Sequence, residues 1–156
     1  MITNTQGEIL APSIEKLFKK VPLSAQDIFV DLGSGRGQIT KQVFLQTEVK
    51  EAWGIECLEL LHLEAIKELP VSEGRRLNFI LGDFLNYSLM GATVALINSA
   101  CFGPKLLNPL GERLNQTTSI KTVCTLRPIL TLTRLQFIKT IRVECSWDSA
   151  LCYIYQ

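Results

Sequence analysis

Three glycines at alternate positions follow an apolar stretch, residues 27–32, and precede a helical pattern. Glycine lets the backbone turn tightly and lets a ligand approach without meeting a Cβ atom. The spacing is G-x-G-x-G, and Gln38 stands where the G-x-G-x-x-G fingerprint of dinucleotide sites has glycine. Asp31 lies just before the turn, and a fixed carboxylate there suits a cationic ligand better than a pyrophosphate. The glycines of the turn are Gly33, Gly35 and Gly37.

Further acidic residues follow the next two predicted strands. Glu56 comes nineteen residues after Gly37, where an acidic residue accepts hydrogen bonds from both ribose hydroxyls of an adenosine ligand. Asp83 and Phe84 follow the third strand, where a carboxylate takes the adenine amino group and an aromatic ring covers the base. Together these residues predict a pocket for a nucleoside with a positive tail. S-adenosylmethionine fits that description, because it carries an ammonium and a sulfonium group and no phosphate.

Alternating strand and helix patterns place these residues at successive strand ends. A weaker helical pattern follows Pro104, and Pro109 and Gly111 predict that this helix is short or kinked. The alternation predicts a parallel sheet with helices on both faces, and the last two strands are close enough to form an antiparallel hairpin. The predicted fold class is therefore α/β, a Rossmann-like and mostly parallel sheet of about seven strands with a C-terminal antiparallel hairpin. Strands are predicted over 27–32, 53–56, 77–82, 92–98, 119–126, 135–145 and 150–155, and helices over 12–21, 37–47 and 58–69.

The length and composition limit the classes of function. The chain has 156 residues, so we expect residues 1–156 to form a single domain. A net charge of +1 argues against a general nucleic-acid-binding surface. We find no apolar run of about 18 residues, as a membrane-spanning helix requires, and no signal-peptide pattern. The five cysteines form no CxxC pair and there is one histidine, so we expect a reducing cytoplasm, no disulfide framework and no metal site.

Other reactive or charged side chains are predicted to be structural. His62 lies on the apolar stripe of its helix, so we expect it in the core. We interpret the cysteines as small core residues, although Cys57 and Cys101 lie near the predicted pocket. The pairs Lys19-Lys20 and Arg75-Arg76 are too short to form a binding patch, and we interpret them as solvated surface.

These motifs resemble those of class I S-adenosylmethionine-dependent methyltransferases. More narrowly, they are similar to the disruptor-of-telomeric-silencing family, the histone-lysine methyltransferases that lack a SET domain. The resemblance runs from Gly7 to about Tyr155, and its most specific parts are F-V-D-L-G-S-G-x-G-Q over 29–38 and I-N-S-A-C-F-G-P over 97–104. It implies S-adenosylmethionine as the cofactor and the lysine side chain of a protein as the methyl acceptor.

The resemblance also implies roles for individual residues. Asn98, Phe102 and Tyr153 would act in catalysis, and Trp147 would join Phe102 and Tyr153 in the wall of a narrow lysine channel. The loop that begins at Gly7 would close over the amino-acid end of the cofactor. The implied cofactor-binding residues are Glu8, Asp31, Gly33, Gly35, Gln38, Glu56, Asp83, Phe84 and Asn98.

The chain departs from the family pattern at several positions. Gln6 stands where the family has Tyr, Cys57 where it has Lys, Ser99 where it has a second Asn, and Ala100 where it has an aromatic residue. The helical N-terminal region and the basic tail of the eukaryotic members do not occur in this sequence. These departures leave the predicted cofactor site in place and argue against a nucleosome as the substrate.

Two alternatives to a protein-lysine methyltransferase stay open. The same core serves methyltransferases of small molecules or RNA, although the stretch that begins at Asn98 lacks the Pro-Pro-[Tyr/Phe/Trp] used in nucleobase amino methylation. A module that binds the cofactor without turnover is the second alternative. For lysine we expect no dedicated general base, because desolvation and a neighbouring sulfonium both favour the neutral amine. We also expect Glu56→Ala to weaken cofactor binding about tenfold with the fold intact.

Overall fold

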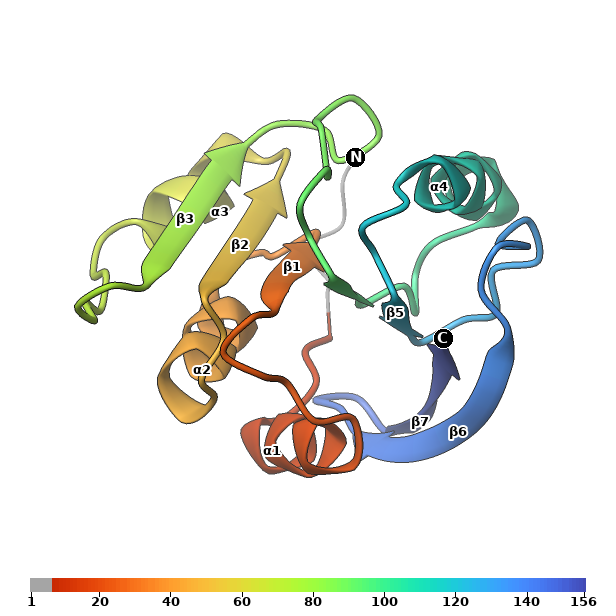
Figure 1. Ribbon diagram of the computed structural model, residues 1–156, viewed down its shortest axis with the longest axis horizontal. Helices are drawn as coiled ribbons and strands as arrows, with labels where there is room; N and C mark the ends of the chain where they lie inside the picture. The colour runs from red at the N-terminus through yellow and green to blue at the C-terminus, as the bar shows by residue number, and fades with distance from the viewer. Residues whose placement is uncertain (1–6) are drawn as a thin grey trace.

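The computed structural model describes residues 7–156, and within them seven strands form one sheet with the order β3-β2-β1-β4-β5-β7-β6 (Figure 1). The strands are β1 (Ile28–Leu32), β2 (Glu51–Glu56), β3 (Arg76–Leu81), β4 (Val94–Ile97), β5 (Thr122–Thr125), β6 (Phe137–Glu144) and β7 (Ser149–Tyr155). The helices are α1 (Ala11–Lys20), α2 (Gln38–Gln46), α3 (Glu59–Ala65) and α4 (Pro104–Gln116).

The strand pairing confirms the predicted fold class. β1 pairs in parallel with β2 and with β4, and β3 and β5 extend the parallel part on either side. β7 pairs antiparallel with both β5 and β6, so the C-terminal hairpin is present as predicted. The carboxyl ends of β1 to β5 therefore share one edge of the sheet, and the turn between β6 and β7 lies at the same edge.

Two apolar layers cover the two faces of the sheet. α1 and α2 pack on one face through residues such as Leu17 and Phe44, whereas Leu110 and Leu114 of α4 pack on the other (Figure 1). α3 lies on the α2 side, because its Ala65 reaches the start of α2. Among residues 7–156, no helix has the length and apolar character needed to cross a membrane.

Two helices differ in length from the prediction. α3 ends at Ala65, four residues before the expected end at Leu69, and His62 is half-buried rather than in the core. α4 runs for thirteen residues through both Pro109 and Gly111, so of the two predicted alternatives, a short or a kinked helix, the short one is wrong. Gly111 has a packing reason, because a Cβ atom there would lie 2.0 Å from the Thr131 hydroxyl. Tertiary packing thus overrides the low helix propensity of these two residues.

Arg75 does not belong to a solvated surface pair, which corrects the sequence interpretation. Its Nε donates to Val49 O at 2.9 Å, and its Nη2 donates to the carbonyls of Phe44 in the last turn of α2 and of Thr47 just after it. The guanidinium also lies 4.3 Å from the Phe44 ring centroid. Arg134 plays the same part after α4, since its Nη2 donates to three carbonyls, those of Leu114, Thr117 and Ile120. Each arginine thus ties the last turn of a helix to the loop that follows it.

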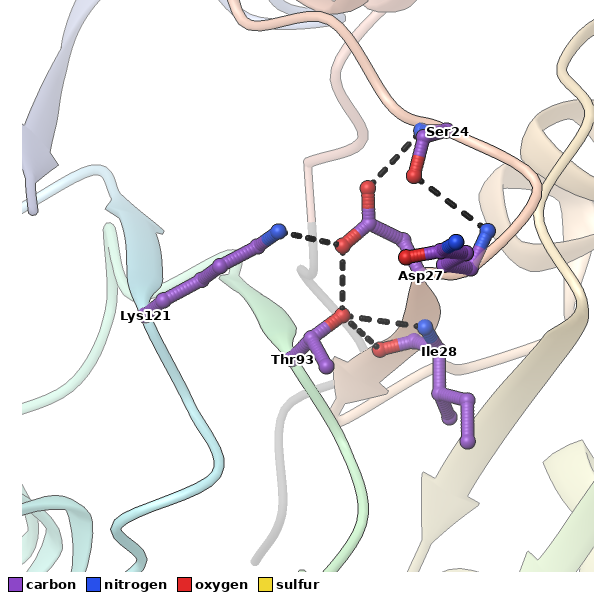
Figure 2. A network of polar contacts seen from close by, with 6 residues as sticks. Ser24, Asp27, Ile28, Thr93 and Lys121 are labelled. Atoms are coloured by element: carbon purple, nitrogen blue, oxygen red, sulfur yellow. Dashed lines mark hydrogen bonds and ion pairs between the residues drawn. The ribbon is translucent and has the colours of Figure 1, made fainter.

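A buried carboxylate joins the amino ends of three strands, as Figure 2 shows. Asp27 accepts hydrogen bonds from Ser24 N–H at 2.8 Å and from the Thr93 hydroxyl at 2.8 Å, and it pairs with Lys121 Nζ at 3.0 Å. Thr93 Oγ1 in turn accepts from Ile28 N–H. Burial alone would raise the pKa of Asp27, but the hydrogen bonds from Ser24, Lys121 and Thr93 hold it below its usual value. The network fixes the sheet at the edge opposite the glycine turn.

Candidate functional site

The glycine turn has the backbone conformation that its sequence predicts. Gly33, Gly35 and Gly37 have φ angles of 83°, 57° and 81°, in the left-handed region that other residues rarely occupy. A Cβ atom on Gly37 would lie 2.6 Å from the Phe79 ring and 3.0 Å from Ala65. Both the torsion angles and the packing therefore require glycine here. The turn carries the chain from β1 to the first residue of α2, Gln38.

Three carboxylates converge beside this turn. Asp31, the fourth residue of β1, is 2% exposed and accepts a hydrogen bond from the Thr40 hydroxyl at 3.1 Å. Burial, together with the negative charges of Glu56 and Glu8, raises the pKa of Asp31 to about 7, against the lowering effect of the Thr40 hydrogen bond. A carboxyl with this pKa is partly protonated near neutral pH, and a cation beside it would favour its ionised form. The arrangement is therefore suited to a positively charged ligand.

Glu56 at the end of β2 has a second task that the sequence did not indicate. Its Oε1 accepts the Gly35 N–H at 2.8 Å, and its Oε2 accepts the Leu58 N–H at 3.0 Å. The carboxylate thus holds the glycine turn to the start of α3 while each oxygen keeps a lone pair for a hydroxyl donor. Glu56→Ala would leave two backbone N–H groups unpaired, so the expectation of an intact fold in that variant no longer stands.

Asp83 and Phe84 lie beyond the end of β3, as predicted. Asp83 is exposed, and its carboxylate accepts hydrogen bonds from Leu85 N–H at 2.9 Å and from the Asn86 amide at 3.2 Å. The ring of Phe84 lies 6.1 Å from the ring of Phe102. Phe102 also borders the glycine turn, since a Cβ atom on Gly33 would lie 3.7 Å from it. The structure therefore brings the third and fourth strand ends together through two aromatic rings.

Residues 7–10, which we call the N-terminal strap, lie across this edge of the sheet. Asn98 Nδ2 donates to Gly7 O at 2.8 Å. Ser146 exchanges two hydrogen bonds with Glu8, because Glu8 N–H donates to its Oγ at 3.0 Å and its own N–H donates to Glu8 O at 2.9 Å. A bridge between Ile9 and Cys145 continues this pairing. Gln6, where the family has Tyr, lies outside the described residues.

The aromatic residues predicted to form one channel wall lie in separate places. Trp147 is half-exposed and packs against Gly7, where a Cβ atom would lie 1.7 Å from its ring. Tyr153 pairs with Thr125 at the carboxyl end of β5, and its ring lies 6.0 Å from Phe137. Tyr153 and Phe102 pack against the same apolar layer, that of α4. Phe102, Trp147 and Tyr153 share the site's edge of the sheet. Within residues 7–156, however, no ring pair joins Phe102 directly to Tyr153 or Trp147.

Ser99, which stands where the family has a second Asn, is a structural residue. It is buried, its Oγ lies 2.7 Å from Thr125 Oγ1, and it accepts the Arg127 N–H at 2.9 Å. Because Thr125 donates its proton to Arg127 O at 2.9 Å, Ser99 must donate to Thr125. The three groups form a closed ring that fixes the loop after β4. Sequence reasoning missed this role, since its partners lie more than twenty-five residues away.

Cysteine positions divide into two groups. Cys124, Cys145 and Cys152 are buried, as predicted, whereas Cys57 and Cys101 are exposed. Burial raises the pKa of the Cys57 thiol, and the negative charge of Glu56 adds to this effect, so Cys57 is not an activated nucleophile. Within residues 7–156 no group of His, Cys, Asp and Glu side chains is arranged to hold a metal ion.

The cavity at the centre of the site is small. It measures about 20 Å³ and lies between the N-terminal strap, the glycine turn and α2. That volume holds about one water molecule, and Glu56, Asp83 and Phe84 are not among its lining residues. The lining residues include Glu8, Asp31, Gly33, Ser34, Gly35, Gln38 and Asn98, which were all predicted cofactor ligands except Ser34.

Residues 2–144 match the family model for the histone methylation protein DOT1. The chain belongs to this family. Among curated relatives, it is 33% identical over 137 residues to the H3 lysine-79-specific histone-lysine N-methyltransferase of Aspergillus fumigatus, covering 78% of this chain and 26% of the relative. It is 29% identical over 154 residues to the enzyme of the same description from Drosophila melanogaster, covering 86% of this chain and 8% of the relative. The chain thus spans about a quarter or less of these relatives.

Solved structures share the fold of this DOT1-family chain at low sequence identity. An RNA methyltransferase from Salinibacter ruber, in complex with S-adenosyl-L-homocysteine, superposes with a TM-score of 0.69 and 19% identity, covering 90% of this chain and 88% of that chain. Magnesium protoporphyrin IX methyltransferase from Synechocystis PCC 6803, with bound SAM, superposes with a TM-score of 0.71 and 11% identity, covering 91% and 74%. These likenesses concern the fold.

Proposed function

We propose that this DOT1-family chain is an S-adenosylmethionine-dependent methyltransferase that acts on the lysine amine of a protein substrate. The observation that carries the proposal is the buried cluster of Asp31, Glu8 and Glu56 beside a turn of three glycines. Family membership supports the same reaction, because the curated relatives are named histone-lysine methyltransferases. A protein substrate in the cytoplasm, and a single domain over residues 1–156, stay our predictions.

The residues at the strand ends fit the cofactor chemically. Asp31 and Glu8 offer negative charge to its ammonium group, and Gln38 and Asn98 offer amide groups in the same cavity. Glu56 offers free lone pairs to the ribose hydroxyls, and the backbone at Gly33 and Gly35 presents no Cβ atom. The hydroxyl of Ser34 is buried without a hydrogen-bond partner in this wall, so a polar acceptor remains unused. Asp83 and Phe84 would hold the adenine edge and ring.

When bound, the cofactor supplies a methyl group on a sulfonium, which is already activated for in-line displacement. The protein's task is then to align the acceptor amine and exclude water. Phe102 presents an apolar ring between the glycine turn and Phe84, and Tyr153 lies at the adjoining strand end. Asn98 holds the strap closed over the site through its bond to Gly7.

The same environment prepares a lysine for reaction. An exposed lysine amine has a pKa of about 10.4 and is protonated at neutral pH. Apolar walls disfavour its charged form, and so does a cationic neighbour, so the proton leaves to solvent before transfer. Asn98, Phe102 and Tyr153 are the residues to which we assign this step.

The test is incubation with methyl-labelled S-adenosylmethionine and fractions of a cell lysate, with core histones and nucleosomes tested separately. Label on a lysine of a protein, identified by mass spectrometry, is the expected result. Label on RNA or on small metabolites would replace the proposed substrate class. Saturable cofactor binding without any transfer would show a binding module instead. Glu56→Gln is the matched control, because it keeps one acceptor oxygen for the glycine turn and loses the charge.

A further inference from the structure

The segment that contains α3 exposes large apolar side chains rather than burying them. Within α3 the buried residue is Ala65, the smallest apolar residue of the helix. Leu60 is 79% exposed and Val71 is 93% exposed, and the residues between them that also point outward are 40–47% exposed. The members of this surface, which we call the α3 patch, are Leu60, Leu63, Ile66, Leu69 and Val71.

Three members of the α3 patch are neighbours on the helix, and Leu69 and Val71 follow them in the chain after α3 ends. Leu60, Leu63 and Ile66 follow one another at intervals of three residues, and side chains three apart touch on a helix surface. Leu58 and Leu61 are half-buried on the side of the helix that faces the sheet. Apolar side chains therefore lie both on the half-buried side of this segment and on its exposed side. An exposed group of large apolar side chains marks an interaction surface.

The charged residues around the α3 patch indicate the chemistry of the partner that would cover it. Residues 58–74 contain four exposed glutamates and one lysine, Lys67, which pairs with Glu64 at 2.8 Å. Arg36 from the glycine turn also lies near Glu64, and together with the dominant Lys67 it lowers the pKa of that carboxyl. The rim stays acidic after both cations are counted. The glutamates are Glu59, Glu64, Glu68 and Glu73.

A second copy of the chain is a poor fit for this surface. In a two-fold symmetric dimer the same patch would meet itself, so each acidic rim would face another acidic rim. Like charges brought together across an interface oppose binding. Anionic lipids and nucleic acids meet the same repulsion. A polypeptide helix with apolar residues flanked by Lys or Arg would place apolar side chains against the patch and positive charges beside its acidic rim.

We propose that the α3 patch docks a basic amphipathic helical segment of another protein. The patch lies at the β3 side of the sheet (Figure 1). It is joined to the site through Leu58, whose N–H donates to Glu56 at 3.0 Å just before α3 begins. The inference does not rest on the proposed methyl transfer, because it uses only exposed side chains outside the site.

The experiment measures binding of fluorescent synthetic helical peptides to the full chain. One peptide combines leucine with lysine in an amphipathic pattern, and its partner has glutamate in place of lysine. We expect saturable binding of the lysine peptide and at least tenfold weaker binding of the glutamate peptide. Leu60→Gln with Leu63→Gln should weaken lysine-peptide binding by about tenfold or more. Leu45→Gln, an equally polar change at an exposed leucine of α2, should leave it unchanged.

A second pair of variants tests the acidic rim without touching the apolar side chains. Glu68→Lys with Glu73→Lys should weaken the lysine peptide and strengthen the glutamate peptide, whereas Glu112→Lys on α4 should change neither. Equal affinity for the two peptides, or an equal loss in the Leu45 variant, would overturn the proposal. So would a wild-type dimer, seen by sedimentation, that Leu60→Gln with Leu63→Gln dissociates, because a second copy would then cover the patch.

Discussion

Asp31 should make cofactor binding depend on pH. Its pKa is raised to about 7, so without ligand about one-tenth of the molecules carry the ionised form at pH 6. At pH 7.5 the ionised fraction is about three-quarters. If the cationic ligand binds the ionised form, affinity for S-adenosylmethionine should be about eightfold weaker at pH 6 than at pH 7.5.

Isothermal titration calorimetry measures both parts of this effect. The dissociation constant should fall as pH rises, and at pH 6 binding should release nearly one proton, seen as a dependence of the heat on the buffer. Asp31→Asn should weaken binding and remove the slope. Glu8→Gln should move the profile to lower pH, because it removes one of the charges that raise the pKa. A flat profile in the wild type, or the same slope in Asp31→Asn, would refute the reasoning.

The same group sets the stability of the ligand-free protein. The folded pKa lies above the unfolded value of 3.8, so the folded state holds the proton more tightly. The stabilisation is complete below about pH 4 and is lost as pH rises to about 7, by at most about 4 kcal/mol. Urea unfolding should show this slope in the wild type relative to Asp31→Asn, which removes the titrating carboxyl. A slope of the opposite sign would contradict the buried position of Asp31.

Three further substitutions test single contacts by urea unfolding. Gly37→Ala should cost about 2–4 kcal/mol, because the added Cβ meets Phe79 in a left-handed backbone; a cost below about 1 kcal/mol would contradict the geometry. Arg134→Met should cost about 2–3 kcal/mol through the loss of its charge-assisted hydrogen bonds to three carbonyls, with Arg127→Met, an exposed side chain, as the control. Ser99→Ala should cost about 1–3 kcal/mol and Ser99→Thr less, since the threonine keeps the hydroxyl; equal losses would argue against the hydrogen-bonded ring.

The parts of the site that the sequence predicts are those determined by residues adjacent in the chain. Alternation and glycine spacing place Asp31, Gly33 and Glu56 at strand ends, since a strand and its following turn are adjacent in the chain. The roles of Arg75 and Ser99 depend on partners about thirty residues away, and no local pattern reports such partners. The length of α4 is mispredicted for the same reason, because the contact that requires glycine at position 111 comes from the distant segment at Thr131.

The N-terminal strap has a kinetic consequence. Because Asn98, Ser146 and Trp147 all hold it, a ligand beneath it leaves only when several contacts break together. Residence time then becomes separable from affinity. Asn98→Ala should shorten the lifetime of the bound state more than it changes the equilibrium constant, because it removes the hydrogen bond that holds the strap as well as a ligand contact. Stopped-flow displacement beside calorimetry would measure the two quantities separately, and an equal change in both would show that the strap does not limit exchange.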